Sequence, residues 1–212
     1  MKNQQKIQLL VIIMTNAIPL AGVEFWKWNA FQIIFVFWLE SLIVGYFATL
    51  EISTLEDSLG LPAWTDPPSR GNTLLFILLY FPVLIGYFFW ISEVIGGSKL
   101  LTPFAVLKPF KSQIALFGAS FILSHGIRFK NFKALAEKSE VGAVKYFLSP
   151  FLRLILVQGL LVTSLYWIYY RHAALIFFVV TYLVKLALDI GFYYWHEVHI
   201  PPVIKDREFF GV

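Results

Sequence analysis

The last apolar segment of the chain, "VKLALDIGFYYWHE", carries two side chains of opposite charge, Lys185 and Asp189. A spacing of four residues places both on one face of a helix, about 6 Å apart along its axis. At this spacing the two charges pair and partly neutralise each other. The same face continues to Tyr193 and His196, so the sequence predicts a polar line along the final helix.

Two other apolar segments each contain an ionisable residue. Glu40 lies midway along "FVFWLESLIVGYF", and Arg153 lies in "SPFLRLILVQG". Together with Lys185 and Asp189 they sum to zero net charge, which a stable buried network requires. We expect one buried polar cluster inside a helix bundle, made of Glu40, Arg153, Lys185, Asp189, Tyr193 and His196. Two interpretations stay open: a polar lock that fixes helix packing, or a functional site such as a proton path, a headgroup pocket or a ligand anchor.

A second group of polar residues is expected at the cytoplasmic edge of the bundle. It contains His125, Arg128, Glu197 and His199, from "SHGIRF" and "WHEVHIPP". Histidines at i and i+3 can bind a transition metal. The stretch lacks the HExxH spacing and ends at two prolines, so we expect interfacial or network histidines and no metal. No cofactor motif is present, and a bound lipid or pigment is the cofactor hypothesis that remains open.

The composition shows which elements must position these residues. The chain is 58% hydrophobic and 14% charged, with a mean hydropathy of +0.72, which is typical of an integral membrane protein. Aromatic residues, at 18%, suit contact with lipid, and the absence of cysteine excludes disulfides and thiolate sites. The net charge of +4 lies mostly in segments at the membrane edge, so we expect the lipid bilayer as a partner and no nucleic acid.

The hydrophobic pattern predicts an all-α, polytopic transmembrane bundle. A helix needs about 20 mainly apolar residues to cross a bilayer. We expect one domain over residues 1–212, with about six spans at 7–25, 30–50, 73–95, 113–128, 150–170 and 173–197. The fourth span is the shortest, so five spans and a re-entrant segment are the alternative. Lysine and arginine are more frequent in the segments on the side of the N-terminus, which predicts cytoplasmic N- and C-termini.

Several short motifs resemble a family of prokaryotic multi-pass membrane proteins of unknown function. The motifs are "NAIPL", "WLES", "SHGIRFKN", "SPFLR" and "VKLALD". The resemblance includes Asn16, Pro19 and Leu20; Trp38, Leu39 and Glu40; Ser124, His125, Phe129 and Asn131; Pro150 and Arg153; Lys185 and Asp189; and His196 or Glu197. Two positions depart from the pattern, with Ser41 in place of Asn and Gln158 in place of His, and the end of the third span, "FFWISEVIGG", lacks a His of the pattern. The resemblance implies a prokaryotic cell membrane and no known activity.

Three hypotheses for the function follow from these residues. The first is a non-enzymatic accessory or structural subunit whose aromatic-rich helices dock with other membrane subunits, pigments or lipids. The second is a small transporter or proton-handling protein that uses Glu40, Lys185, Asp189 and His196. The third is a lipid-modifying enzyme at the cytoplasmic edge. A polar lock predicts a dry cluster in which every charge is paired. A transporter predicts a water-filled path that reaches the cluster, and an enzyme predicts a cavity at the membrane edge with converging polar groups.

Overall fold

The chain folds into long helices that lie side by side. The computed structural model describes residues 3–26, 28, 30–59, 71–96, 111–136, 143–171 and 175–197. These ranges contain the helices α1 (Asn3–Trp26), α2 (Ala30–Leu59), α3 (Gly71–Gly96), α5 (Lys111–Ala136), α6 (Ala143–Arg171) and α7 (Leu175–Glu197). No strand occurs within the described ranges, and the prediction of an all-α fold is confirmed for them.

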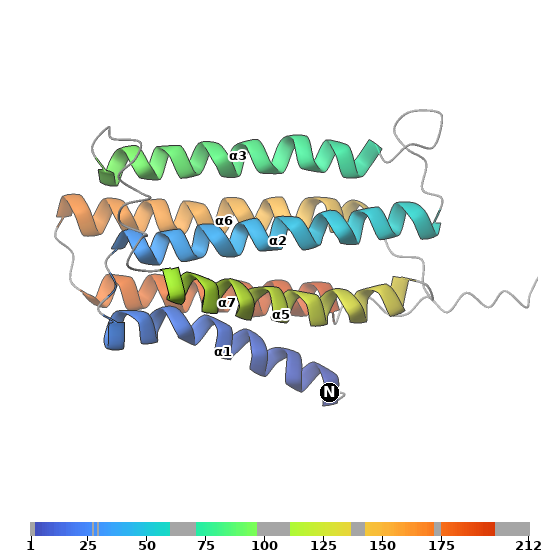
Figure 1. Cartoon of the computed structure of the whole chain (residues 1–212), viewed down its shortest axis with the longest axis horizontal. Helices are drawn as coiled ribbons and strands as arrows, with labels where there is room; N and C mark the ends of the chain where they lie inside the picture. The colour runs from blue at the N-terminus through green and yellow to red at the C-terminus, as the bar shows by residue number, and fades with distance from the viewer. Residues whose placement is uncertain are drawn as a thin grey trace, which may run out of the picture.

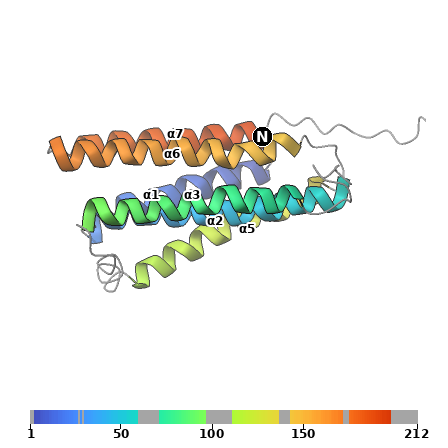
Figure 2. The ribbon, with the colours of Figure 1, turned by 90° about the horizontal axis from the view of Figure 1, so that it is seen from above.

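The helices share one long axis and alternate in direction along it (Figure 1). Helix α2 is central and packs against α1, α3, α5 and α6, whereas α7 packs against α6 and α1. The N-terminal half of α1 tilts away from α5 and α7 in the view of Figure 1, and Figure 2 shows α1 running obliquely to the other helices towards the side of α6 and α7. The beginning of α1 and the end of α7 lie at the same end of the bundle, which is called the basic end below.

Four of the helices are long and apolar enough to cross a membrane. The qualifying windows, searched within the described residues, are Leu9–Trp26, Gln32–Glu56, Gly71–Trp90 and Phe147–Ser164. This composition is that of a membrane protein, as predicted. The number of predicted crossings, six, is larger than the number of qualifying helices, because α5 and α7 are not among them.

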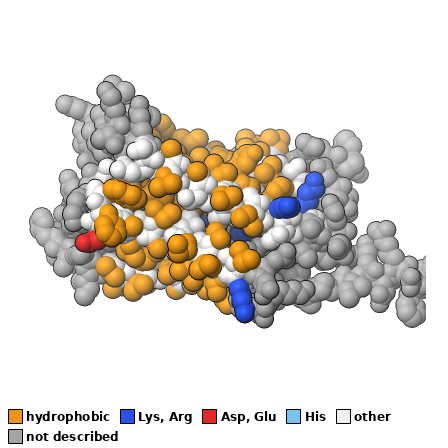
Figure 3. All heavy atoms as spheres, turned by 60° about the horizontal axis from the view of Figure 1, so that its bottom comes forward, with side chains coloured by type: hydrophobic (Ala, Val, Ile, Leu, Met, Phe, Trp, Pro, Cys, Tyr) orange, Lys and Arg blue, Asp and Glu red, His pale blue; other side chains and the backbone are white. Residues whose placement is uncertain are grey.

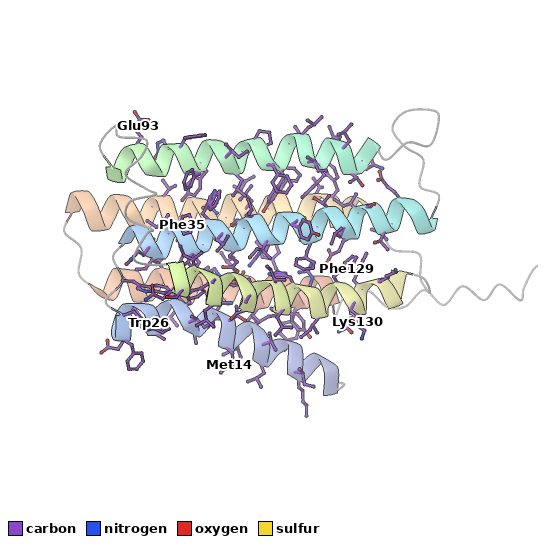
Figure 4. All side chains as sticks on the ribbon, viewed as in Figure 1. Met14, Trp26, Phe35, Glu93, Phe129 and Lys130 are labelled. Atoms are coloured by element: carbon purple, nitrogen blue, oxygen red, sulfur yellow. The ribbon has the colours of Figure 1, made fainter. Side chains whose placement is uncertain are left out.

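The outer surface fits the same interpretation. Exposed leucine, isoleucine and valine side chains are numerous on α3 and α6. Apolar side chains also cover most of the face shown in Figure 3, where the charged side chains at the two ends are basic at one and acidic at the other. Glu93 and Lys130 lie at opposite ends of the bundle in Figure 4.

Helix α2 is longer than predicted. The prediction ended this span at residue 50, because acidic and turn-forming residues follow. The structure continues the helix to Leu59, with Ile52 and Leu55 buried on its apolar face and Glu51 buried as well. The start of the predicted exposed loop is therefore helix, and the residues that looked loop-like have partners on other helices.

Helices α5 and α6 also extend beyond the predicted spans. The predicted fourth span, 113–128, is part of one continuous helix from Lys111 to Ala136. Helix α6 begins at Ala143, before Pro150, which lies inside it. Phe132 on α5 is buried, and Phe147 on α6 packs against Phe76, which stabilises these extensions.

Aromatic packing joins α3 to the central helix. The Trp38 ring on α2 packs against Phe88 on α3, with ring centroids 4.8 Å apart, and the Trp38 indole donates a hydrogen bond to the carbonyl oxygen of Leu84 at 2.9 Å. The Tyr80 ring lies 2.3 Å from the point that a Cβ atom would occupy on Gly45, so only glycine allows this approach of α3 to α2. The Tyr80 hydroxyl also donates a hydrogen bond to the carbonyl oxygen of Ser41, at 2.9 Å. Around Gly45 and Tyr80, helix α3 is therefore attached to α2 by neutral contacts. At the beginning of α3, the Glu56 carboxylate of α2 accepts hydrogen bonds from the backbone of Asn72 and Thr73 and from the Thr73 hydroxyl.

Candidate functional site

Four charged side chains form a closed ring between α2, α6 and α7, called the ion-pair ring below: Glu40, Lys185, Asp189 and Arg153. Lys185 Nζ lies 2.7 Å from Glu40 Oε2 and 2.7 Å from Asp189 Oδ2. Arg153 Nη2 lies 2.6 Å from Glu40 Oε1 and 2.8 Å from Asp189 Oδ1. Each carboxylate therefore contacts both cations, and the four formal charges cancel.

The helices position this ring in a simple way. The spacing of four residues brings Lys185 and Asp189 together on α7, while α2 and α6 each contribute one residue. The side chains of Lys185, Glu40 and Asp189 are 1%, 4% and 5% exposed, whereas that of Arg153 is 16% exposed. Arg153 is therefore the most exposed member of the ring.

Helix α1 joins the ring through Asn16. Lys185 Nζ donates a hydrogen bond to Asn16 Oδ1 at 2.6 Å, and the Asn16 amide nitrogen donates to the carbonyl oxygen of Ile12 at 3.0 Å. The hydroxyl of Tyr182 donates to the backbone carbonyl of Asn16. The Lys185 ammonium thus donates two hydrogen bonds, to Asn16 and Asp189, and its contact with Glu40 Oε2 is an ion pair without hydrogen-bond geometry.

The two positions that depart from the motif pattern lie in contact. Gln158 Nε2 donates to Ser41 Oγ at 2.8 Å, and Ser41 Oγ donates to the carbonyl oxygen of Phe37 at 3.0 Å. Both side chains are buried next to the ring, because Ser41 follows Glu40 on α2. The sequence did not indicate this pairing, since the residues are 117 positions apart.

A second ion pair lies closer to the basic end. The Arg128 guanidinium contacts both carboxylate oxygens of Glu51, with Nη2 at 2.9 and 3.0 Å and Nε at 3.3 Å from Oε1. Glu51 is 3% exposed and Arg128 is 29% exposed. Sequence reasoning selected Arg128 but missed Glu51, which was assigned to a loop. Nearby, the His125 imidazole stacks on the Phe47 ring, with centroids 5.9 Å apart.

A cavity of about 80 Å³ connects the two charged sites. Its polar wall includes Glu40, Arg153 and Asp189 from the ring, together with Ser124, His125 and Arg128 from α5. Its apolar wall includes Ile7, Val11 and Ile12 from α1 and Phe121 and Ile127 from α5. Of these residues, Ile7, Val11 and Ile12 belong to the N-terminal half of α1, which tilts away from α5 and α7 in Figure 1.

The predicted site residues are only partly described by the structure. Tyr193 is buried and lines the cavity, as do His125 and Arg128, so the predicted cluster and the predicted edge site share one space. The side chains of His196 and Glu197 and all of His199 lie outside the described residues. Among the described residues, no three His, Asp or Glu side chains are grouped as metal ligands would be.

Comparison with known families identifies the group to which the chain belongs. The model of a family of unknown function, DUF6498, matches residues 1–201. The chain belongs to this family. No curated protein and no solved structure matches it. Because DUF6498 is a family of unknown function, the function of this member has to be inferred from the chemistry of the cavity and the ion-pair ring.

Proposed function

We propose that this DUF6498 member is a non-enzymatic, multi-pass membrane protein that binds an amphiphilic ligand, such as a membrane lipid, in the cavity beside the ion-pair ring. The observation that carries this proposal is the mixed lining of the cavity. Charged groups from α2, α5, α6 and α7 line it together with apolar side chains of α1, α2 and α5. Polar groups converging in an otherwise apolar pocket are typical of sites for amphiphilic ligands.

The topology that fits this function has six crossings and both termini in the cytoplasm of a prokaryotic cell. Exposed Lys6, Lys130 and Lys133 belong to helix segments at the basic end, whereas exposed Glu24 and Glu93 belong to the ends of α1 and α3 at the opposite end. An excess of lysine and arginine marks the cytoplasmic side. Pairing within the ring lowers the cost of burying Lys185 and Asp189 and so supports a crossing by α7.

In this proposal the ion-pair ring has a structural role that makes the cavity possible. The ring connects α2, α6 and α7, and Asn16 adds α1 to it. The mutual ion pairs of the ring and the low exposure of Glu40, Lys185 and Asp189 support this structural role. Docking with other membrane subunits remains a prediction, because the exposed aromatic side chains of α1 and α3 serve contact with lipid equally well.

Proton or ion transport is the second candidate function. The observation that favours it is that the cavity reaches three members of the ring, Glu40, Arg153 and Asp189. A transporter requires these groups to change partners during each cycle. Lys185 contacts Asn16, Asp189 and Glu40 at the same time, which speaks for a fixed ring, and therefore for binding over transport.

Filling the cavity tests the proposed function. Ser124 lines the cavity from α5, and Ser120 lies one turn earlier on the same helix and does not line it. We expect Ser124→Phe, purified from native membranes in an uncharged detergent, to lose most of the lipid that copurifies with the wild type. Ser120→Phe should retain it. Native mass spectrometry, followed by extraction and identification of the bound lipid, provides the measurement.

Two results would contradict the proposal. Equal retention of lipid by both phenylalanine variants would show that the cavity is not the binding site. The second result is a wild-type protein that copurifies with no ligand but conducts protons in vesicles. If Asp189→Asn abolishes that conduction, transport is supported instead.

A further inference from the structure

We infer that the cavity recognises a singly charged oxyanion, the phosphodiester or carboxylate headgroup of an amphiphile, through the guanidinium groups of Arg153 and Arg128. This inference rests on the proposed function, because it specifies the ligand of the same cavity. Both arginines line the cavity, one from the ion-pair ring and one from the pair with Glu51.

Each arginine retains unused hydrogen-bond donors. Arg153 uses Nε and Nη2 for Asp189 and Glu40, and Arg128 uses Nε and Nη2 for Glu51. Within the part of the chain that the structure describes, the Nη1 group of neither arginine has an acceptor. A guanidinium carries five N–H donors in a planar fork, so each residue offers two further donors for an oxyanion.

The local charges favour a monoanion. The ion-pair ring is neutral, and so is the pair formed by Arg128 and Glu51. An incoming anion therefore gains directed hydrogen bonds but finds no excess positive charge to neutralise it. Burying uncompensated charge is costly, and a dianion would cost more than a monoanion. Phosphodiesters and carboxylates carry one negative charge, which the free guanidinium edges can stabilise through charge-assisted hydrogen bonds.

The size of the cavity indicates which part of the ligand it holds. A volume of about 80 Å³ is several times the roughly 10–15 Å³ that one water requires, but far below the size of a phospholipid. The headgroup therefore enters, and the acyl chain stays outside. Exposed Ile7 and Leu10 on α1, and Ile127 on α5, provide an apolar surface for that chain next to the cavity.

The test compares ligands of different charge on protein purified in an uncharged maltoside detergent. The probes are dioleoylphosphatidylglycerol, oleate and dioleoylphosphatidylcholine, titrated in mixed micelles with binding followed by native mass spectrometry. We expect the two anionic probes to bind more tightly than the zwitterionic one. Preference between phosphatidylglycerol and oleate then shows whether the headgroup is a phosphodiester or a carboxylate.

Matched variants separate recognition by the guanidinium from general attraction to positive charge. The double variant Glu51→Gln with Arg128→Gln removes the donors without changing the net charge, whereas Lys130→Gln removes one charge at an exposed position two residues away. We expect the double variant to weaken binding of the anionic probe roughly tenfold. Lys130→Gln should leave binding nearly unchanged. Arg128→Lys keeps the charge and should weaken binding to a similar degree. This variant provides the test if the double variant fails to fold.

The outcomes distinguish this inference from the proposed function. Unchanged anion binding in both Arg128 variants, with loss of binding in Ser124→Phe, overturns oxyanion recognition and leaves the cavity as the binding site. A larger loss in Lys130→Gln than in the double variant also overturns it, because surface charge then accounts for binding. Unchanged binding in Ser124→Phe overturns both proposals.

Discussion

Helix α2 has two faces that are held in different ways. Around Gly45 it meets α3 through neutral contacts: a close glycine contact, packing of the Trp38 ring against Phe88, and hydrogen bonds from the Tyr80 hydroxyl and the Trp38 indole. Towards α6 and α7 it uses the ion-pair ring, with a cavity beside it. The first face tolerates the loss of any one contact, since each is small. The second depends on every charge being present, because removal of one leaves another buried and uncompensated.

The largest expected effect comes from breaking the ion-pair ring. In Asp189→Asn, Arg153 and Lys185 both lose a carboxylate partner, and the ring retains one negative charge for two positive charges. Loss of one partner of a buried pair costs about 3–5 kcal/mol. We expect a large fall in the thermal unfolding temperature in detergent, or failure to accumulate in membranes.

A paired substitution sharpens this result. Lys185→Met with Asp189→Leu removes one charge of each sign and leaves Glu40 paired with Arg153. Replacing a buried ion pair with apolar residues of similar volume is often neutral. The double variant should therefore be more stable than Asp189→Asn alone. If it is less stable, the cost does not come from uncompensated charge and the comparison fails.

The neutral face is tested by a smaller change at its closest contact. A Cβ atom at Gly45 would lie 2.3 Å from the Tyr80 ring, so Gly45→Ala should push α3 away and destabilise the protein by about 1–3 kcal/mol. Gly86→Ala on α3 is the control, since nothing lies within 4 Å of its Cβ position. Equal unfolding temperatures for the two variants would show that α3 does not approach α2 this closely.

The smallest expected effect comes from one hydrogen bond on the same face. Tyr80→Phe removes the bond to the carbonyl of Ser41 and leaves the ring packing intact. We expect a loss of about 1 kcal/mol in stability and no change in bound lipid. A loss of lipid in this variant would link the neutral face to the cavity and remove the distinction between the two faces.

Much of the fold was readable from the sequence because a membrane helix is identified by its own composition. The positions of the helices followed from apolar runs, and the pairing of Lys185 with Asp189 follows from their spacing on one helix. The choice of Glu40 and Arg153 as counter-ions relied on charge balance alone. That reasoning works where few charges are available to choose from.

Contacts between distant segments were not readable in the same way. Glu51 and Arg128 are 77 positions apart, and "EISTLED" resembles a loop until its partner on α5 is known. The same holds for Asn16 and Lys185, 169 positions apart, where a single polar residue in an apolar helix gave no sign of its partner. Helix ends at 59 and 136 were missed because tertiary packing, not local composition, stabilises them.

The central claim is that the cavity opens at the basic end, reaches the ion-pair ring and prefers anions. The chain has no cysteine, so one introduced thiol reports on its own position. Ser124→Cys lines the cavity, and Ser164→Cys is a buried control on α6 that does not. Two membrane-impermeant thiosulfonates, one negatively and one positively charged, are applied from the cytoplasmic side. We expect the negatively charged reagent to modify the cysteine of Ser124→Cys faster than the positively charged reagent does. The cysteine of Ser164→Cys should stay unmodified. No reaction at 124, or equal reaction at both positions, would contradict the account.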